Sequence, residues 1–278
     1  MPPPPRKKGR KAGRKTPLNE AASQRDRNVM AMVAQAVERK NVLLAYQPVV
    51  LARRPKRAAF FEGLIRVMDT SGRIIPAREF IDTVENLELG RKLDCLALEI
   101  GLDTLRRVPH LRLAINMSAR SIGYEPWSAT LRAGLAADPT AAERLILEIT
   151  EKSTMVMPEI VTVFMKDLQK DGISFALDDF GAGYTSFRYL RDFYFDILKI
   201  DGEFVRNVAR SADNQVLVQA LVDVARHFDM FTVAESVETA QDVAFLTSAG
   251  VDCLQGYHFA APSTRPAWLD RAEMRQTA

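Results

Sequence analysis

The sequence predicts an α/β protein, a TIM-like (β/α)8 barrel with an irregular, antiparallel first pair of strands. Eight short β-rich runs alternate with longer helical segments from about residue 29 onward. Most of these runs are continuously apolar, which is typical of strands covered on both faces. Only about seven residues separate the first two runs, too few for a parallel crossover. The first pair is therefore expected to be a hairpin.

The predicted elements follow one another regularly along the chain. The strands are expected at residues 43–50, 58–67, 111–118, 144–150, 173–179, 195–201, 231–236 and 251–257. Stretches such as 76–107 and 214–228 carry apolar residues three and four positions apart, which predicts amphipathic helices. Alternation of this kind favours a parallel sheet, and eight strands favour a closed barrel. A doubly wound open sheet is the alternative, although no glycine-rich phosphate-binding turn follows the first strand.

Composition places the chain among ordinary globular proteins. Of its 278 residues, 47% are hydrophobic and 26% are charged, which is enough for a large core. No apolar stretch approaches the roughly 18 to 20 residues of a membrane span, and no apolar signal segment follows the basic N-terminus. We therefore predict a cytoplasmic protein. Cys95 and Cys253 show neither a metal-ligand spacing nor a disulfide framework, which favours buried free thiols.

The N-terminal segment differs in composition from the rest of the chain. Residues 1–27 carry nine Lys or Arg against Glu20 and Asp26, and four prolines stand together near their start. We expect a disordered basic tail there, a single domain over 28–270, and a C-terminal tail over 271–278. The tail is expected to contact nucleic acid, an anionic membrane or an acidic protein. A solvated tail that only aids solubility is the alternative.

Polar residues fall at or near the ends of the predicted strands. Asp178 and Asp179 follow one apolar run directly, and Glu62 lies within the second strand. The carboxyl ends of barrel strands converge on one mouth, where active sites are built. The residues expected there are Glu62, Asn116, Glu148, Asp178, Asp179, Lys199, Glu235 and Gln255.

The charge of this group needs compensation. Five of its residues are acids, and so many carboxylates in a small volume would raise their pKa values or destabilise the site. Two divalent cations together with Lys199 would balance them, and oxygen ligands suit Mg²⁺ or Mn²⁺. Taken singly, each residue also has a structural explanation; Lys199, for example, could pair with Asp196 or Asp201 on the surface.

The motifs around these residues resemble the EAL-domain family, the bacterial cyclic di-GMP phosphodiesterases. The resemblance covers about residues 40–263, in order, and it rests on these stretches: AYQPVV, FEGLIR, INMSAR, LEITE, LDDFGAGYTSF, LKIDGEFV, VAESVET and LQGYHFAAP. It implies hydrolysis of cyclic di-GMP to linear 5′-pGpG by a two-metal mechanism. It also implies a homodimer.

The same resemblance assigns a role to each residue. It implies a first metal held by Glu62, Asn116, Glu148 and Asp178, and a second held by Asp178, Asp179 and Glu235. Lys199 would orient the attacking water and help to deprotonate it, Gln255 would lie beside the metals, and Glu151 would anchor the loop after Asp179. The residues implied to contact the substrate are Gln47, Pro48, Leu64 and Arg66, the last through a phosphate.

One departure from the family pattern bears on activity. Ser236 stands where the family has a glycine after the glutamate, and a serine in an unusual backbone geometry would tilt Glu235. A second interpretation is therefore a non-catalytic protein of the same fold that binds cyclic di-GMP as an effector or scaffold. A turnover assay beside a binding titration distinguishes the two.

Overall fold

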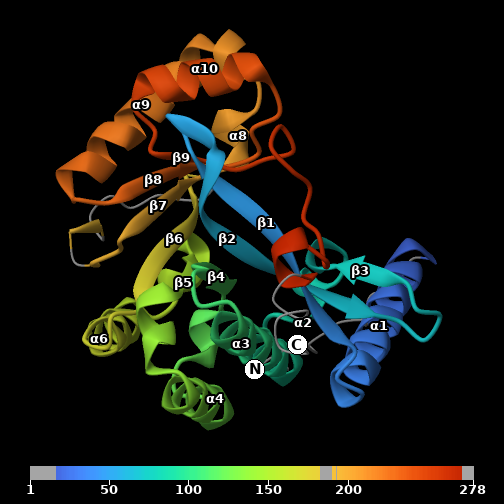
Figure 1. Cartoon of the computed structure of the whole chain (residues 1–278). Coiled ribbons are helices and arrows are strands. Elements are labelled where there is room, and N and C mark those ends of the chain that lie inside the picture. Colours follow the sequence, from blue (N-terminus) through green and yellow to red (C-terminus); the bar gives the residue numbers. More distant parts are fainter. Residues whose placement is uncertain (1–16, 182–189, 192, 271–278) are drawn as a thin grey trace, which may run out of the picture.

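The protein is a closed β-barrel surrounded by helices (Figure 1). The structure is a computed structural model that describes residues 17–181, 190, 191 and 193–270. The strands are β1 (Val42–Leu51), β2 (Arg54–Met68), β3 (Ile74–Pro76), β4 (Leu113–Asn116), β5 (Leu145–Thr150), β6 (Ser174–Phe180), β7 (Ile197–Ile200), β8 (Phe231–Ala234) and β9 (Cys253–Leu254).

Longer helices alternate with the later strands and cover the outside of the barrel (Figure 1). The helices are α1 (Pro17–Glu38), α2 (Ile81–Val84), α3 (Glu88–Arg107), α4 (Glu125–Ala137), α5 (Glu151–Thr154), α6 (Pro158–Gln169), α8 (Gly202–Val205), α9 (Ala212–His227) and α10 (Ala240–Ala249). Within the described ranges, 3-10 turns lie at Ala77–Glu79, Ala119–Ser121, Pro139–Arg144 and Val208–Arg210.

Strand order confirms the predicted barrel. The strands follow one another as β1-β9-β8-β7-β6-β5-β4-β2-β3, and β1 also pairs with β2, which closes eight of them into a ring. β1 runs antiparallel to β2, as expected from the short connection, and it also runs antiparallel to β9. The remaining ring contacts are parallel. The open-sheet alternative is wrong.

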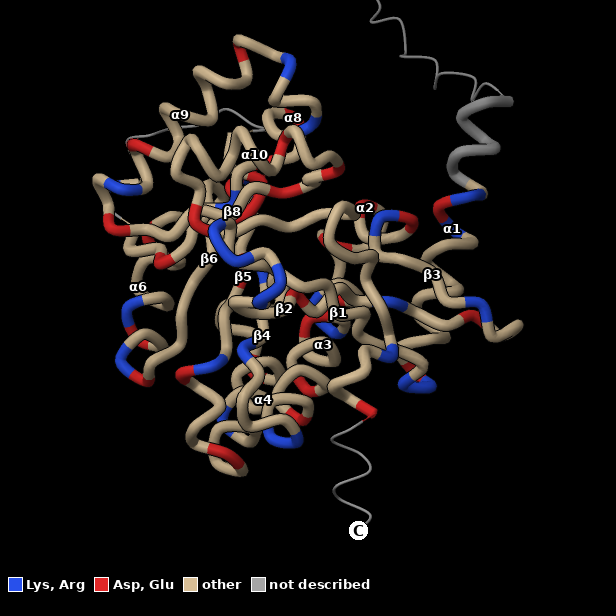
Figure 2. The backbone as a smooth tube through the Cα atoms, turned by 45° about the horizontal axis from the view of Figure 1, so that its top comes forward, with Lys and Arg blue, Asp and Glu red and all other residues tan. Residues whose placement is uncertain are grey.

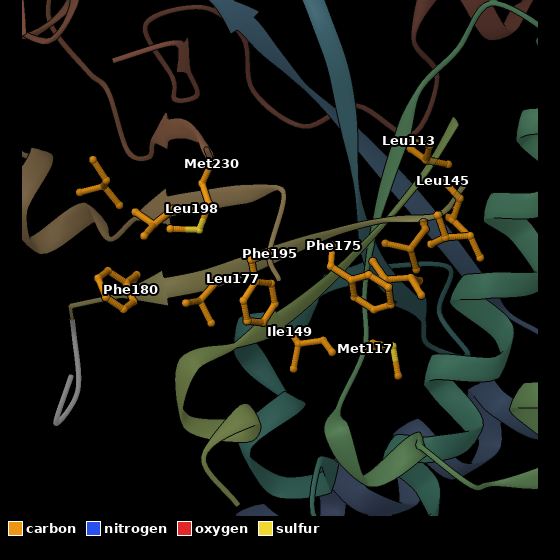
Figure 3. Close-up of a cluster of buried hydrophobic side chains, with 14 of the residues drawn as sticks. Leu113, Met117, Leu145, Ile149, Phe175, Leu177, Phe180, Phe195, Leu198 and Met230 are labelled. Atoms are coloured by element: carbon orange, nitrogen blue, oxygen red, sulfur yellow. The ribbon is translucent and has the colours of Figure 1, made fainter. Parts of the chain in front are cut away.

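The side chains of each strand alternate between the inner and the outer face of the barrel. On the outer face, leucines of neighbouring strands lie with Phe175 in one cluster (Figure 3). The same cluster includes buried side chains from the surrounding helices. Each of these strand residues is next in sequence to one that faces the barrel interior, because successive side chains on a strand point to opposite faces. The continuous apolar runs in the sequence arise from this double burial.

Local signals set the helix ends. Thr239 caps α10, where its hydroxyl accepts a hydrogen bond from the Asp242 amide at 3.1 Å, and Gly250 ends the helix with a φ of +87°. Ser211 caps α9 in the same way, accepting from the Asn214 amide at 3.3 Å. Basic and acidic residues are interspersed over the outer helices, including α4, α6 and α9 (Figure 2).

The N-terminal boundary differs from the expected one. Helix α1 already includes Pro17, inside the segment 1–27 expected to be disordered. Its second half is buried against β2, β3, α2 and α3 through an apolar stripe that includes Val33 and Ala36, and this packing stabilises a helix that extends toward the N-terminus. The expected tails over 1–16 and 271–278 lie outside the described residues.

The fold also includes an additional edge strand and two free cysteines. Strand β3 was not expected; it pairs antiparallel with β2 outside the ring. Cys253 is buried and Cys95 half-buried, both are free, and burial raises the pKa of their thiols to about 12 and about 11. Among the described helices, none is both long and apolar enough to cross a membrane.

Candidate active site

An apolar layer inside the barrel supports the site. Each ring strand contributes one residue to a buried cluster that is separate from the outer core: Val49, Phe60, Ala114, Ile146, Ala176, Ile197, Val233 and Cys253. Residues from all eight strands can meet only in the barrel interior, so this cluster fills its centre.

A ring of polar residues lies one layer above. Residues two positions apart on a strand share a face. On each parallel strand, the residue two positions after the one in the apolar cluster therefore also faces the interior, closer to the carboxyl end of the strand. In β1, which runs the other way, the corresponding position is two residues earlier. This ring, the polar ring, consists of Gln47, Glu62, Asn116, Glu148, Asp178, Lys199, Glu235 and Gln255. It includes all the strand-end residues expected from the sequence except Asp179.

Lys199 lies at the centre of the polar ring. Its side chain is 1% exposed, and its Nζ lies 2.7 Å from Glu235 Oε1, 2.8 Å from Glu148 Oε2, 2.8 Å from Asp178 Oδ1 and 3.6 Å from Glu62 Oε2. One ammonium group thus contacts acids from four strands, and a surface pairing of this lysine is excluded.

Amide side chains hold Glu62 in place. Asn116 Nδ2 donates to Glu62 Oε1 at 2.8 Å, and Gln255 Nε2 donates to Glu62 Oε2 at 2.6 Å. Gln255 Nε2 also reaches Gln47 Oε1 at 3.2 Å, while Gln47 Nε2 donates to the Ala260 carbonyl at 3.1 Å. Both oxygens of this buried carboxylate are therefore oriented by the barrel wall.

An irregular backbone brings Asp179 to the same place. Adjacent residues on a regular strand point to opposite faces, but the pairing of β6 with β7 shifts between Leu177 and Phe180. Asp179 has a φ of +54°, a left-handed conformation that few non-glycine residues adopt. As a result, one oxygen each from Asp178, Asp179 and Glu235 lie within 4.8 Å of one another.

Crowding of the acids changes their protonation. Burial, together with neighbouring carboxylates, raises the pKa of Glu235 to about 8 and of Asp179 to about 6, and it raises the pKa of Glu148 well above its usual value. Burial would also raise the pKa of Glu62, but Lys199 and the two amides more than offset this and lower it. Burial opposes the charged form of Lys199, yet the surrounding acids raise its pKa well above normal. One lysine does not neutralise the group.

The unsatisfied atoms of the site fit divalent cations. Within the described part of the chain, no hydrogen-bond donor reaches Glu148 Oε1 or Gln255 Oε1, although both atoms are buried. Buried acceptors without donors are costly. Oxygen atoms of carboxylates and amides are the ligands that Mg²⁺ and Mn²⁺ prefer. The donor set therefore suits such ions.

Two glycines beside the polar ring, Gly181 and Gly256, make close contacts. Glu151, buried at the start of α5, accepts a hydrogen bond from the Gly181 amide at 3.2 Å, immediately after β6; residues 182–189 of the loop that it was expected to anchor lie outside the described residues. At the other side, a Cβ on Gly256 would lie 2.1 Å from the Val237 carbonyl oxygen. Only glycine permits this approach, which fixes the chain next to Gln255.

A cavity of about 600 Å³ opens above the polar ring. Of the residues implied to contact the substrate, Gln47, Leu64 and Arg66 line it, whereas Pro48 is not among the described residues that line it. The reason is alternation on β1, because Gln47 and Val49 face the interior and Pro48 between them faces outward.

Several lining residues were not expected from the sequence. Arg78, Arg206 and Tyr257 line the cavity from connecting segments. Asp94 of α3 also lines it, with Oδ2 accepting from Ser121 Oγ at 2.6 Å, and burial raises its pKa to about 7. In the sequence Asp94 looks like any polar residue of an amphipathic helix, and no pattern signals its position.

Comparison with known proteins supports the family resemblance of the sequence motifs. A sequence model of the EAL domain matches residues 30–262. PdeB of Shewanella oneidensis, a cyclic di-GMP phosphodiesterase by name, is 31% identical over 248 residues, which are 87% of this chain and 29% of that protein. PdeF of Escherichia coli, named for the same activity, is 29% identical over 255 residues, 90% of this chain and 34% of that protein.

A solved structure is similar in fold. The structure described as PaMucR phosphodiesterase in complex with c-di-GMP superimposes with a TM-score of 0.74 and 30% identity, over 87% of this chain and 98% of that chain. The present chain spans about a third of the length of the two curated relatives.

Proposed function

The chain belongs to the EAL domain family, and from this premise we propose that it is a metal-dependent phosphodiesterase that hydrolyses cyclic di-GMP to linear 5′-pGpG. The observation that carries the proposal is the polar ring, which gathers four acids around Lys199, with Asp179 beside them. Similar proteins named as cyclic di-GMP phosphodiesterases, and a similar structure in complex with c-di-GMP, support the choice of substrate.

Two cations, Mg²⁺ or Mn²⁺, would occupy the acidic group. One would be held by Glu62, Asn116, Glu148 and Asp178, and the other by Asp178, Asp179 and Glu235. When bound, such ions offset negative charge on a phosphate and make a water molecule acidic enough to supply hydroxide near neutral pH.

Lys199 would position the reacting groups. In the metal-free site the surrounding acids raise the pKa of Lys199, and Nζ would act as a cation and hydrogen-bond donor. Bound cations would offset these acids and reduce that rise, and Lys199 would then orient the attacking water and help to deprotonate it. Three carboxylate oxygens lie within 2.8 Å of Nζ, which donates a hydrogen bond to Glu148 Oε2.

Arg66 would bind the substrate phosphate. Its Nη1 donates to the Ile65 carbonyl at 2.8 Å, and Arg66 is one of the residues that line the cavity. Burial, and then the nearby Arg78, lower the pKa of Arg66, which marks a place where an anion is favourable. During hydrolysis the water oxygen would bond to phosphorus while the bond from phosphorus to the 3′ oxygen breaks, and that oxygen would leave with a proton.

A product assay tests the proposal. Purified protein should convert cyclic di-GMP to pGpG with Mg²⁺ or Mn²⁺ and not with excess EDTA, as followed by chromatography. Glu62→Gln keeps the size of the side chain but removes its charge and replaces one of the two accepting oxygens with a donor, and it should reduce turnover at least a hundredfold. Tight binding of cyclic di-GMP without turnover in either metal would contradict hydrolysis and favour the non-catalytic binding role.

Assembly and location remain predictions. We propose a homodimer, and the exposed apolar side chains of Val156, Ile160 and Val163 in and just before α6 support an apolar contact there. Light scattering on the wild type and on Val163→Asp tests it, with a monomeric wild type as the contradicting result. Contacts of the basic N-terminal segment and a cytoplasmic location are proposed from the sequence alone.

A further inference from the structure

Ser236 adopts the backbone conformation that a glycine favours. Its φ is +53°, in the left-handed region, and it directly follows Glu235 in the polar ring. A serine in this region is strained relative to glycine. Strain of this kind persists where the surrounding structure compensates for it, and it concentrates at functional sites.

The hydroxyl of Ser236 contacts one partner across the mouth of the barrel. Arg206 Nη2 donates a hydrogen bond to Ser236 Oγ at 3.2 Å. Gly202 provides the space, because a Cβ there would lie 2.5 Å from Ser236 Oγ and 3.1 Å from Arg206 Nη2. A glycine at position 236 would leave Arg206 without this contact.

Arg206 is an available cation at the cavity. It lines the cavity together with Ser236, Glu235 and Asp179. Among the residues that the structure describes, no carboxylate lies within ion-pair distance of it, and the serine hydroxyl is its recorded side-chain partner. A guanidinium that keeps most of its donors free suits a phosphate, which accepts two parallel hydrogen bonds.

The position of Arg206 complements that of Arg66. Arg66 belongs to β2, and Arg206 follows β7 through the short helix α8. In the closed ring, β2 and β7 are four strands apart, on opposite sides of the barrel. Cyclic di-GMP carries its two phosphates on opposite sides of its ring, so two arginines facing each other across the cavity match the charge distribution of the ligand.

We propose that Ser236 positions Arg206 so that its guanidinium binds the phosphate of cyclic di-GMP on the side of the cavity opposite Arg66. Arg206 is thus a substrate-binding residue and Ser236 a positioning residue. The proposal rests on the proposed function for the identity of the ligand.

Steady-state kinetics with Mn²⁺ test it through four variants. Arg206→Gln should raise KM about tenfold, since it removes a charge-assisted contact, and change kcat less than twofold. Ser236→Ala keeps the Cβ but removes the hydroxyl, and it should raise KM about threefold. The double variant should match Arg206→Gln, because Ser236 acts through Arg206. Arg210→Gln, in the neighbouring turn, is the matched control and should leave KM unchanged.

Salt provides a second readout. Because the contact is electrostatic and near the surface, KM of the wild type should rise more steeply with NaCl than KM of Arg206→Gln. An unchanged KM in Arg206→Gln, or additive effects in the double variant, would overturn the proposal. If the wild type does not turn over cyclic di-GMP, the proposed function fails, and calorimetric titration of the same variants with cyclic di-GMP still tests the Arg206 contact: equal affinities would overturn it.

Discussion

Replacing Lys199 with methionine tests the electrostatics of the polar ring. The change leaves a side chain of similar length but removes the cation that lies within 2.8 Å of three carboxylates, those of Glu148, Asp178 and Glu235, the first two of which are buried. Breaking a buried ion pair by removing one partner costs about 3 to 5 kcal/mol. For a chain of this size, each kcal/mol corresponds to about 2 to 4 °C in Tm. Metal-free Lys199→Met should therefore melt about 6 to 20 °C below the wild type.

The loss of stability in Lys199→Met should depend on pH and on bound metal. Without Lys199 the pKa values of the acids rise further, so between about pH 4.5 and the raised values the folded state binds more protons than the unfolded state, and stability falls as pH rises. The deficit should be larger at pH 8 than at pH 5, and Mn²⁺ should recover part of it. Calorimetry measures the melting points. Lys170→Met is the control, because Lys170 pairs with Asp167 on the surface, where such pairs contribute about 1 kcal/mol or less. A Lys199→Met variant that melts within 2 °C of the wild type at pH 8 would refute the reasoning.

Three further perturbations test other parts of the site. Asn116→Ala removes a proposed ligand and a hydrogen bond that orients Glu62, and it should weaken Mn²⁺ binding about tenfold or more by titration calorimetry. Burial raises the pKa of the Asp94 carboxyl from 3.8 to about 7. The stability that this group contributes is therefore present at low pH and is lost as pH rises through 7. In urea unfolding, the free energy of unfolding of Asp94→Asn should fall less between pH 5 and pH 8 than that of the wild type. Gly256→Ala should leave the protein largely insoluble, because its Cβ would overlap the Val237 backbone, whereas Gly72→Ala, at a φ of +84° with open space around it, should cost only about 1 to 2 kcal/mol.

Each of these has a contradicting result. Wild-type affinity for Mn²⁺ in Asn116→Ala would remove that residue from the metal site. Parallel pH profiles for Asp94→Asn and the wild type would show that Asp94 does not titrate in this range. A soluble Gly256→Ala that melts like Gly72→Ala would mean that the chain beside Gln255 is free to move.

Sequence patterns predicted the barrel because its constraints are local and repeated. Apolar runs mark strands that are buried on both faces, and the short link before β2 marks a hairpin. The acids at strand ends were predicted for the same reason, since a closed barrel brings the carboxyl ends of its parallel strands to one mouth. A period of two then places Glu62, Glu148 and Asp178 directly above the apolar layer.

Other features depend on contacts that no local pattern records. The left-handed conformation of Asp179 arises where the pairing of β6 and β7 shifts. Arg206 and Asp94 reach the cavity from helices and connecting segments, whose side-chain directions depend on packing. Pro48 was misplaced because a motif match does not state which face of a strand a residue occupies. The start of α1 was missed because burial of its second half extends the helix.

We propose that acids from separate strands share one mouth because two divalent cations lie among them. A crystal structure of the protein grown with Mn²⁺, with an anomalous difference map, shows directly whether they do. Two peaks about 3.5 to 4 Å apart are expected, with Asp178 between them. A map without a peak beside Asp178, at a Mn²⁺ concentration that supports turnover, would contradict it.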